Sequence, residues 1–135
     1  AETAQFGDQH AQFGLIPGWG GSQRLVRLMG LRRALDLMFS ARWLKADEAK
    51  EAGLVNYVVA DDQLHSAALA YCQKIGTRSR QGMAEMKRLG REGLELTLDQ
   101  SMRLERDAAL RHLPGAEVAE GLDAFANRRE PRFEQ

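Results

Sequence analysis

The sequence has little that would direct the protein to a special environment. Its 135 residues include one cysteine, Cys72, so no disulfide can form within the chain, which favours a reducing compartment such as the cytoplasm. Basic and acidic residues number 19 each, which leaves no net charge to attract nucleic acid or an anionic membrane. No apolar run approaches the roughly 20 residues that a membrane-crossing helix needs. We therefore expect a cytoplasmic protein with no nucleic-acid partner and no membrane contact.

What the sequence does contain is typical of an ordinary globular protein. Hydrophobic residues make up 44% of the chain and aromatic residues 7%, a composition unlike that of a disordered protein. A chain of 135 residues suits a single domain and can bury a real core. We therefore expect one domain over residues 1–135.

Apolar residues recur at helical spacing along most of the chain. Gly53 is placed as a helix C-cap, Asp61 or Asp62 as an N-cap, and Thr97 with Gln100 as a capping box. These signals predict helices at 21–29, 31–39, 46–52, 62–76, 80–92, 98–113 and 116–128.

Two of these helices carry specific expectations for burial. The helix at 31–39 has a predicted apolar stripe formed by Leu31, Leu35, Met38 and Phe39. In the helix at 62–76, Cys72 shares one face with apolar neighbours and is expected to be buried.

Strand character is confined to two short segments. Residues 3–6 alternate in polarity, and residues 54–59 are rich in β-branched side chains. Because two strands alone do not make an independent sheet, they need a helix layer, a second copy or a missing partner segment. The predicted fold class is therefore mostly α with two short strands.

The most informative segment is the glycine-rich turn at residues 13–25, which reads Phe-Gly-Leu-Ile-Pro-Gly-Trp-Gly-Gly-Ser-Gln-Arg-Leu. Pro17 fixes φ before the turn, and Gly18, Gly20 and Gly21 remove Cβ atoms that would hold a ligand or a helix away. A helix start of this kind can cradle an anion, but the lysine of a phosphate loop and the dinucleotide spacing are missing. Tight helix packing is the favoured interpretation.

This segment resembles a signature of the crotonase family, the enoyl-CoA hydratases and isomerases, in which Gly-x-Ile-Pro-Gly-x-Gly-Gly-x-Gln-Arg-Leu borders the acyl pocket. The resemblance continues through most of the chain, at residues 31–42, 46–49, 53–59, 120–125 and 129–133. Lys45 departs from the Ser or Thr cap that is common in the family. The resemblance implies that the acyl pocket is lined by Leu15, Ile16, Pro17, Gly18 and Trp19.

His10 is the candidate catalytic residue. A histidine in a polar loop is usually just solvated, but the resemblance places His10 where crotonase hydratases carry a catalytic glutamate in Phe-Gly-x-Pro-Glu. Gln9 replaces the proline of that motif. Imidazole can transfer protons near neutral pH, although such a replacement also fits changed or absent hydratase chemistry. If the loop is strand-like, alternation places Asp8 on the same side as His10, where the two can form a hydrogen-bonded pair.

Other charged residues have simpler interpretations. The basic run Arg78, Arg80, Lys87, Arg88 and Arg91 is interleaved with apolar residues and lacks stacking aromatics, so it predicts a solvated helix face. A few arginines near the C-terminus, Arg128, Arg129 and Arg132, could meet a phosphate. His65 and His112 have no partners at metal-ligand spacing, so we expect no metal and no bound cofactor.

The resemblance implies that the chain is the C-terminal, helical part of the ClpP/crotonase fold. Residues 1–60 would form its pocket side and residues 61–135 its helical oligomerisation part. The family's preceding half supplies the oxyanion hole and the first catalytic glutamate. The expected partners are therefore an acyl-CoA substrate and either a second copy, as a dimer or trimer, or an N-terminal crotonase half.

Two functions remain open from the sequence. The first is a fragment of an acyl-CoA-processing enzyme, a hydratase or isomerase, that is inactive alone because half of its site is missing. The second is a non-catalytic module for self-association or partner binding, since helix faces that normally cover the missing half would be exposed.

Overall fold

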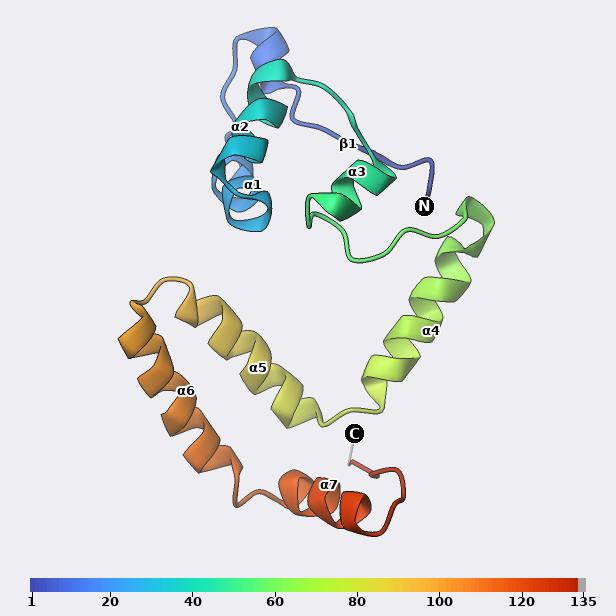
Figure 1. The fold of residues 1–135 in the computed structure, drawn as a ribbon, viewed down its shortest axis with the longest axis vertical. Coiled ribbons are helices and arrows are strands. Elements are labelled where there is room, and N and C mark those ends of the chain that lie inside the picture. The colour runs from blue at the N-terminus through green and yellow to red at the C-terminus, as the bar shows by residue number, and fades with distance from the viewer. Residues whose placement is uncertain (134–135) are drawn as a thin grey trace. The chain divides into compact units, whose positions relative to one another are not determined.

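A computed structural model describes residues 1–133 of the chain. These residues divide into two compact units, the first at Ala1–Ala68 and the second beginning at Leu69. The boundary falls within helix α4 (Leu64–Gly76), and each unit is described by itself. The structure is mostly helical with two short strands, as the sequence predicts (Figure 1).

The first unit contains short elements around three helices. In chain order these are β1 (Gln5–Phe6), the 3-10 helix η1 (His10–Phe13), α1 (Gly21–Met29), α2 (Leu31–Ser40), β2 (Leu44–Lys45), α3 (Ala46–Glu51) and the 3-10 helix η2 (Asp61–Gln63). The second unit contains α5 (Arg80–Gly93), α6 (Leu98–His112) and α7 (Ala116–Ala126).

The core of the first unit lies where α1, α2, β2 and α3 meet. Its buried members are Met29, Ala34, Leu37, Met38, Leu44 and Ala49. The predicted stripe of α2 is partly wrong, because Leu31 and Phe39 are exposed while Ala34 and Leu37 face the core. Small and large residues three positions apart share a helix face, so Ala34 lets α2 approach its neighbours closely.

The strand pairing differs from the prediction. Strands β1 and β2 pair antiparallel, with Gln5 opposite Lys45 and Phe6 opposite Leu44. Residues 54–59 form no strand, so the prediction there is wrong. The N–H of Leu54 instead donates to Ala49 O at the end of α3, and the carbonyl of Val59 accepts only the N–H of Glu2. A segment rich in β-branched residues becomes a strand only where another strand lies beside it and pairs with it.

Capping predictions have mixed outcomes. Thr97 and Gln100 form the predicted box, with Thr97 N–H donating to Gln100 Oε1 at 3.0 Å. Gly53 follows α3 with a φ of +75°, which is the left-handed ending that the sequence predicts. Asp61 does not cap α4. Its carboxylate accepts hydrogen bonds from the N–H and hydroxyl of Thr3, which lower the pKa of Asp61.

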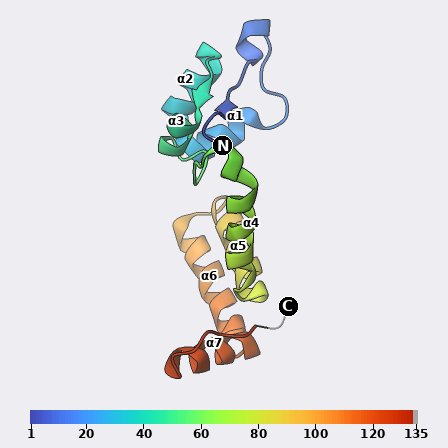
Figure 2. The same ribbon diagram turned by 90° about the vertical axis from the view of Figure 1, so that its right-hand side faces the viewer.

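The second unit has few buried residues. Helices α5 and α6 are consecutive and pack against each other (Figure 2). Ala108 and Ala124 are buried, whereas Cys72 of α4 is exposed, contrary to the prediction. No residue of α4 is buried in the structure, so its apolar face carries no cover among the described residues. Within residues 1–133 no helix is long and apolar enough to span a bilayer.

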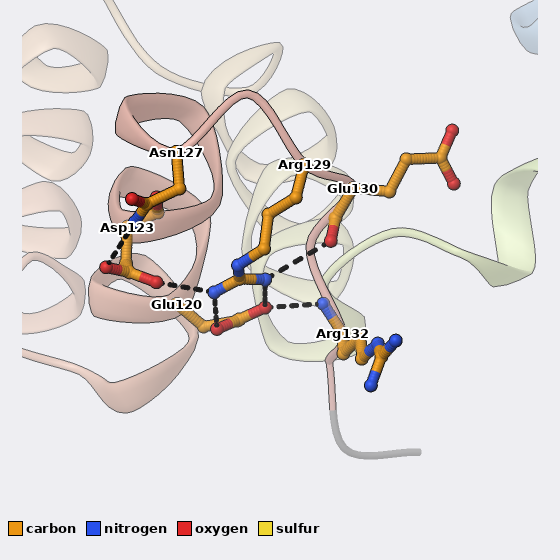
Figure 3. A network of polar contacts seen from close by, with 6 residues as sticks. All are labelled: Glu120, Asp123, Asn127, Arg129, Glu130 and Arg132. Atoms are coloured by element: carbon orange, nitrogen blue, oxygen red, sulfur yellow. Dashed lines mark hydrogen bonds and ion pairs between the residues drawn. The ribbon is translucent and has the colours of Figure 1, made fainter.

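A polar network fixes the turn after α7 (Figure 3). The Arg129 guanidinium donates to both carboxylate oxygens of Glu120, at 2.6 and 2.8 Å, and to Asp123 Oδ2 at 2.5 Å. The backbone N–H of Arg132 donates to the same Glu120 carboxylate at 2.6 Å. These bonds, led by those from Arg129, lower the pKa of Glu120 to about 2.

The network predicts how stability depends on pH. Because the folded-state pKa of Glu120 lies below its ordinary value of 4.5, the contribution is complete above pH 4.5 and is lost as pH falls toward 2. Glu120→Gln should therefore lower the free energy of unfolding near neutral pH and have little effect at the acid end. Urea denaturation across this range measures the difference. The exposed Glu105, which makes no ion pair within residues 1–133, provides the control Glu105→Gln, whose effect on the free energy of unfolding should be small.

The burial pattern of α2 predicts opposite outcomes for two truncations. Leu37 is 1% exposed and Phe39 is 73% exposed. Leu37→Ala should destabilise the chain by about 2–5 kcal/mol through lost burial and a cavity. Phe39→Ala should change the free energy of unfolding by less than about 0.5 kcal/mol. A larger loss from Phe39→Ala than from Leu37→Ala, in urea denaturation, would show that the stripe predicted from the sequence is the right one.

Candidate functional site

The candidate site lies in the loop that runs from β1 to α1. Helix η1 ends at Gly14 with a φ of +64°, and the chain then passes through Pro17 to Gly20, whose φ is +83°. Both glycines adopt the left-handed conformation, which other residues rarely adopt. The loop thereby reverses and delivers the chain to the start of α1 at Gly21.

Asp8 and His10 lie together at the base of this loop. His10 Nδ1 is 2.7 Å from Asp8 Oδ1, and the His10 N–H donates to the same oxygen at 3.2 Å. Asp8 is 7% exposed, whereas the His10 side chain keeps 27% of its exposure. The pair expected from the sequence is therefore present.

Its local geometry differs from the expectation. The sequence places Asp8 and His10 on one side of a strand-like segment, but His10 begins the 3-10 helix η1. The Asp8 carboxylate instead accepts a hydrogen bond from the backbone N–H of His10, two residues ahead. This bond forms an Asx-turn, which aspartate favours. That turn, and not strand alternation, brings the imidazole to the carboxylate.

Gln9 ties the site loop to the core. Its Nε2 donates to the carbonyl of Ala41, just after α2, at 2.8 Å. Ala41 has a φ of +47°, in the left-handed region that residues other than glycine rarely adopt. Gln9, which replaces the proline of the family motif, therefore makes a side-chain hydrogen bond that proline could not make.

Gly21 allows Asp8 to approach α1. A Cβ at Gly21 would lie 3.3 Å from Asp8 Oδ2 and 3.1 Å from Pro17 Cβ. Gly18 has open space around its Cβ position, so close packing gives no reason for that glycine. Of the glycines in the turn, Gly20 is required by its backbone conformation and Gly21 by close contact.

The predicted pocket residues form an uncovered apolar surface. Leu15, Ile16 and Trp19 are 60, 85 and 86% exposed. The Trp19 ring lies beside His10, with 6.2 Å between ring centroids and a tilt of 51°. The structure thus brings Trp19 to the Asp8–His10 pair and leaves the apolar side chains open to a ligand or to another polypeptide.

Asp8 also lines a mainly apolar hollow of about 490 Å³. Its wall includes Phe6, Arg24, Leu37 and Trp43, none of which the sequence singled out. For Arg24 the sequence contained a signal, because this residue belongs to the Gln-Arg-Leu end of the glycine-rich segment. Phe6 and Trp43 come from separate segments, and only the fold brings them together.

Two of the remaining charged candidates are held in ion pairs. Arg88 pairs with Glu85 and Glu92 on α5, as a solvated helix face would. Arg129 is held by the network of Figure 3. Over residues 1–133 no three histidine, cysteine or acidic side chains gather in a way that could hold a metal ion.

Comparison with known proteins gives the same family for the whole length of the chain. A family profile described as "Enoyl-CoA hydratase/isomerase" matches residues 1–135. A probable enoyl-CoA hydratase of Rhizobium meliloti is 39% identical over 133 residues, which are 98% of this chain and 52% of that protein. A crotonyl-CoA hydratase of Syntrophomonas wolfei is 33% identical and is matched over 51% of its length by 98% of this chain.

Solved structures agree. The crystal structure of an enoyl-CoA hydratase from Bacillus anthracis matches with a TM-score of 0.94 at 33% identity, over 98% of this chain and 51% of that one. The chain therefore spans about half the length of the curated relatives and solved structures that it matches. With its entire length matched, the chain belongs to the enoyl-CoA hydratase/isomerase family, the crotonases.

Proposed function

We propose that this chain is the C-terminal half of a protein that processes acyl-CoA thioesters, as a hydratase or an isomerase. The observation that carries the proposal is the glycine-rich turn with the Asp8–His10 pair beside it, within a chain that matches the family from end to end. Relatives at about a third identity are named as enoyl-CoA and crotonyl-CoA hydratases, which supports the substrate class. CoA would be part of the substrate and not a bound cofactor.

Leu15, Ile16, Pro17, Gly18 and Trp19 form one wall of the acyl pocket in this proposal. Their exposure supports it, because large apolar side chains left open beside a polar pair suit the transfer of an acyl chain out of water. His10 occupies the position of the family glutamate and is the group that transfers a proton. The opposing wall and the oxyanion hole come from an N-terminal crotonase half.

A second candidate is a module for self-association or partner binding. An open groove of about 540 Å³ runs along α5 and α6, with Met86, Leu94, Leu98 and Met102 at its surface. Leu94 and Leu98 are 71 and 78% exposed, which favours a covered state in an assembly. A homodimer, a homotrimer or pairing with the N-terminal half would each cover it. Analytical ultracentrifugation of the chain alone distinguishes a dimer or trimer from a monomer, and a monomer would count against self-association.

The acyl-pocket proposal predicts binding of acetoacetyl-CoA, which mimics an enolate. Calorimetric titration of the chain should give saturable binding. Trp19→Ala should weaken it roughly tenfold or more, because covering a large apolar side chain contributes about 1.5–3 kcal/mol.

Phe125 provides the control, since it is 85% exposed against 86% for Trp19 but lies in α7. Phe125→Ala should bind as the unaltered chain does. Absence of saturable binding, or equal losses in both variants, would contradict a pocket at this loop.

The half-site proposal predicts no catalysis by the chain alone. Each missing oxyanion-hole donor lowers the rate by about 10²-fold or more, and both would come from the other half. Purified chain should therefore leave the absorbance of the crotonyl-CoA double bond unchanged. Measurable hydration by these 135 residues would show that they contain a complete site.

A further inference from the structure

The Asp8 carboxylate is nearly buried, and each of its two oxygens lies against a neighbouring group. Oδ1 accepts the backbone N–H of His10 and lies 2.7 Å from His10 Nδ1. Oδ2 faces the first turn of α1, where a Cβ on Gly21 would be 3.3 Å away. With 7% of its surface exposed, this carboxylate has little room to contact a substrate.

The chemistry of the two groups decides where the imidazole proton lies. An ionised carboxylate only accepts hydrogen bonds, so a separation of 2.7 Å requires a hydrogen on His10 Nδ1. A neutral imidazole carries one such hydrogen. The lone pair is therefore on Nε2, the ring nitrogen that Asp8 does not occupy.

We propose that Asp8 is a positioning residue that holds His10 in the Nδ1-protonated form, so that Nε2 is the one atom through which His10 takes up and returns a proton. The proton-transfer role rests on the function proposed above, but the tautomer does not. Asp8 touches no reacting atom in this arrangement, and its carboxylate acts only through the ring.

The proton count closes within this pair. When Nε2 takes a proton, the ring becomes an imidazolium with an N–H at each nitrogen, and the adjacent Asp8 carboxylate stabilises that charge. When Nε2 gives the proton back, the neutral Nδ1–H form is restored. No oxidant, reductant or further reactant is needed.

Nitrogen-15 NMR of the labelled chain tests the tautomer directly. At a pH well above the ordinary histidine pKa of about 6.5, His10 should show a protonated Nδ1 and an unprotonated Nε2. His10→Gln identifies the signals by their loss, and His65 and His112 serve as internal references. An unprotonated Nδ1 on His10 would overturn the proposal.

Two variants remove the Asp8 carboxylate, one by truncation and one by an amide of the same size. Asp8→Ala removes the acceptor, so His10 should change to a mixture in which the Nε2–H form, preferred by imidazole in water, predominates. Asp8→Asn can turn an amide N–H toward Nδ1, so it should also move His10 toward the Nε2–H form. The exposed Asp62 supplies the control Asp62→Asn, which should leave the His10 signals unchanged. An unchanged His10 tautomer in folded Asp8→Ala would refute a positioning role. If Asp8→Ala does not fold, retention of a pure Nδ1–H form in Asp8→Asn would refute it instead.

Addition of acetoacetyl-CoA connects the tautomer to function. The Nε2 signal of His10 should shift more than its Nδ1 signal and more than either reference histidine. Saturable binding that leaves Nε2 unmoved would refute its role in proton transfer. If the ligand does not bind at all, this chain alone does not form an acyl-CoA site, while the tautomer assignment is still decided by the spectra of the free chain.

Discussion

A carboxylate that is nearly excluded from water must be compensated locally, and this requirement shapes the first unit. Within residues 1–133, Asp8 is the buried charged residue. Its compensation comes from the ring and N–H of His10, and from the start of α1, where helix N–H groups favour a negative charge. Gly21 permits the approach, and the turn that Asp8 makes sets the course of the following loop. Removing this charge would alter both the pocket wall and the packing of α1.

The sequence predicted the fold where local signals decide it. Thr97 and Gln100 interact across one helical turn, so their capping box is visible in four consecutive residues. The strand predicted at residues 54–59 was wrong because a strand depends on a partner elsewhere in the chain. Within the described residues, the strand pair forms between β1 and β2 instead. The predicted buried face of α2 was partly wrong for a related reason. Hydrophobicity favours Phe39 for the core, but close packing selects Ala34 and leaves Phe39 outside.

The contact between Asp8 and His10 was predictable from the sequence, whereas its local geometry was less so. The glycine-rich signature located the loop, and the spacing of Asp8 and His10 suggested their contact. The bond from Gln9 to Ala41 joins residues 32 positions apart, so no local pattern could indicate it. Ala41 accepts a left-handed conformation that costs an L-residue about 1–2 kcal/mol. The packing of the first unit therefore has to stabilise this conformation of Ala41, because the Ala41 carbonyl accepts the hydrogen bond that anchors the site loop.

The neighbouring rings of Trp19 and His10 give the protein an internal optical reporter. A cation close to an indole interacts with the ring's π electrons, and the ring centroids here are 6.2 Å apart. The emission of Trp19 should therefore follow the charge on His10, while Trp43, the other tryptophan, supplies the background that a Trp43→Phe variant would remove. Intrinsic tryptophan fluorescence therefore reports the protonation state of His10 in real time, without an added label.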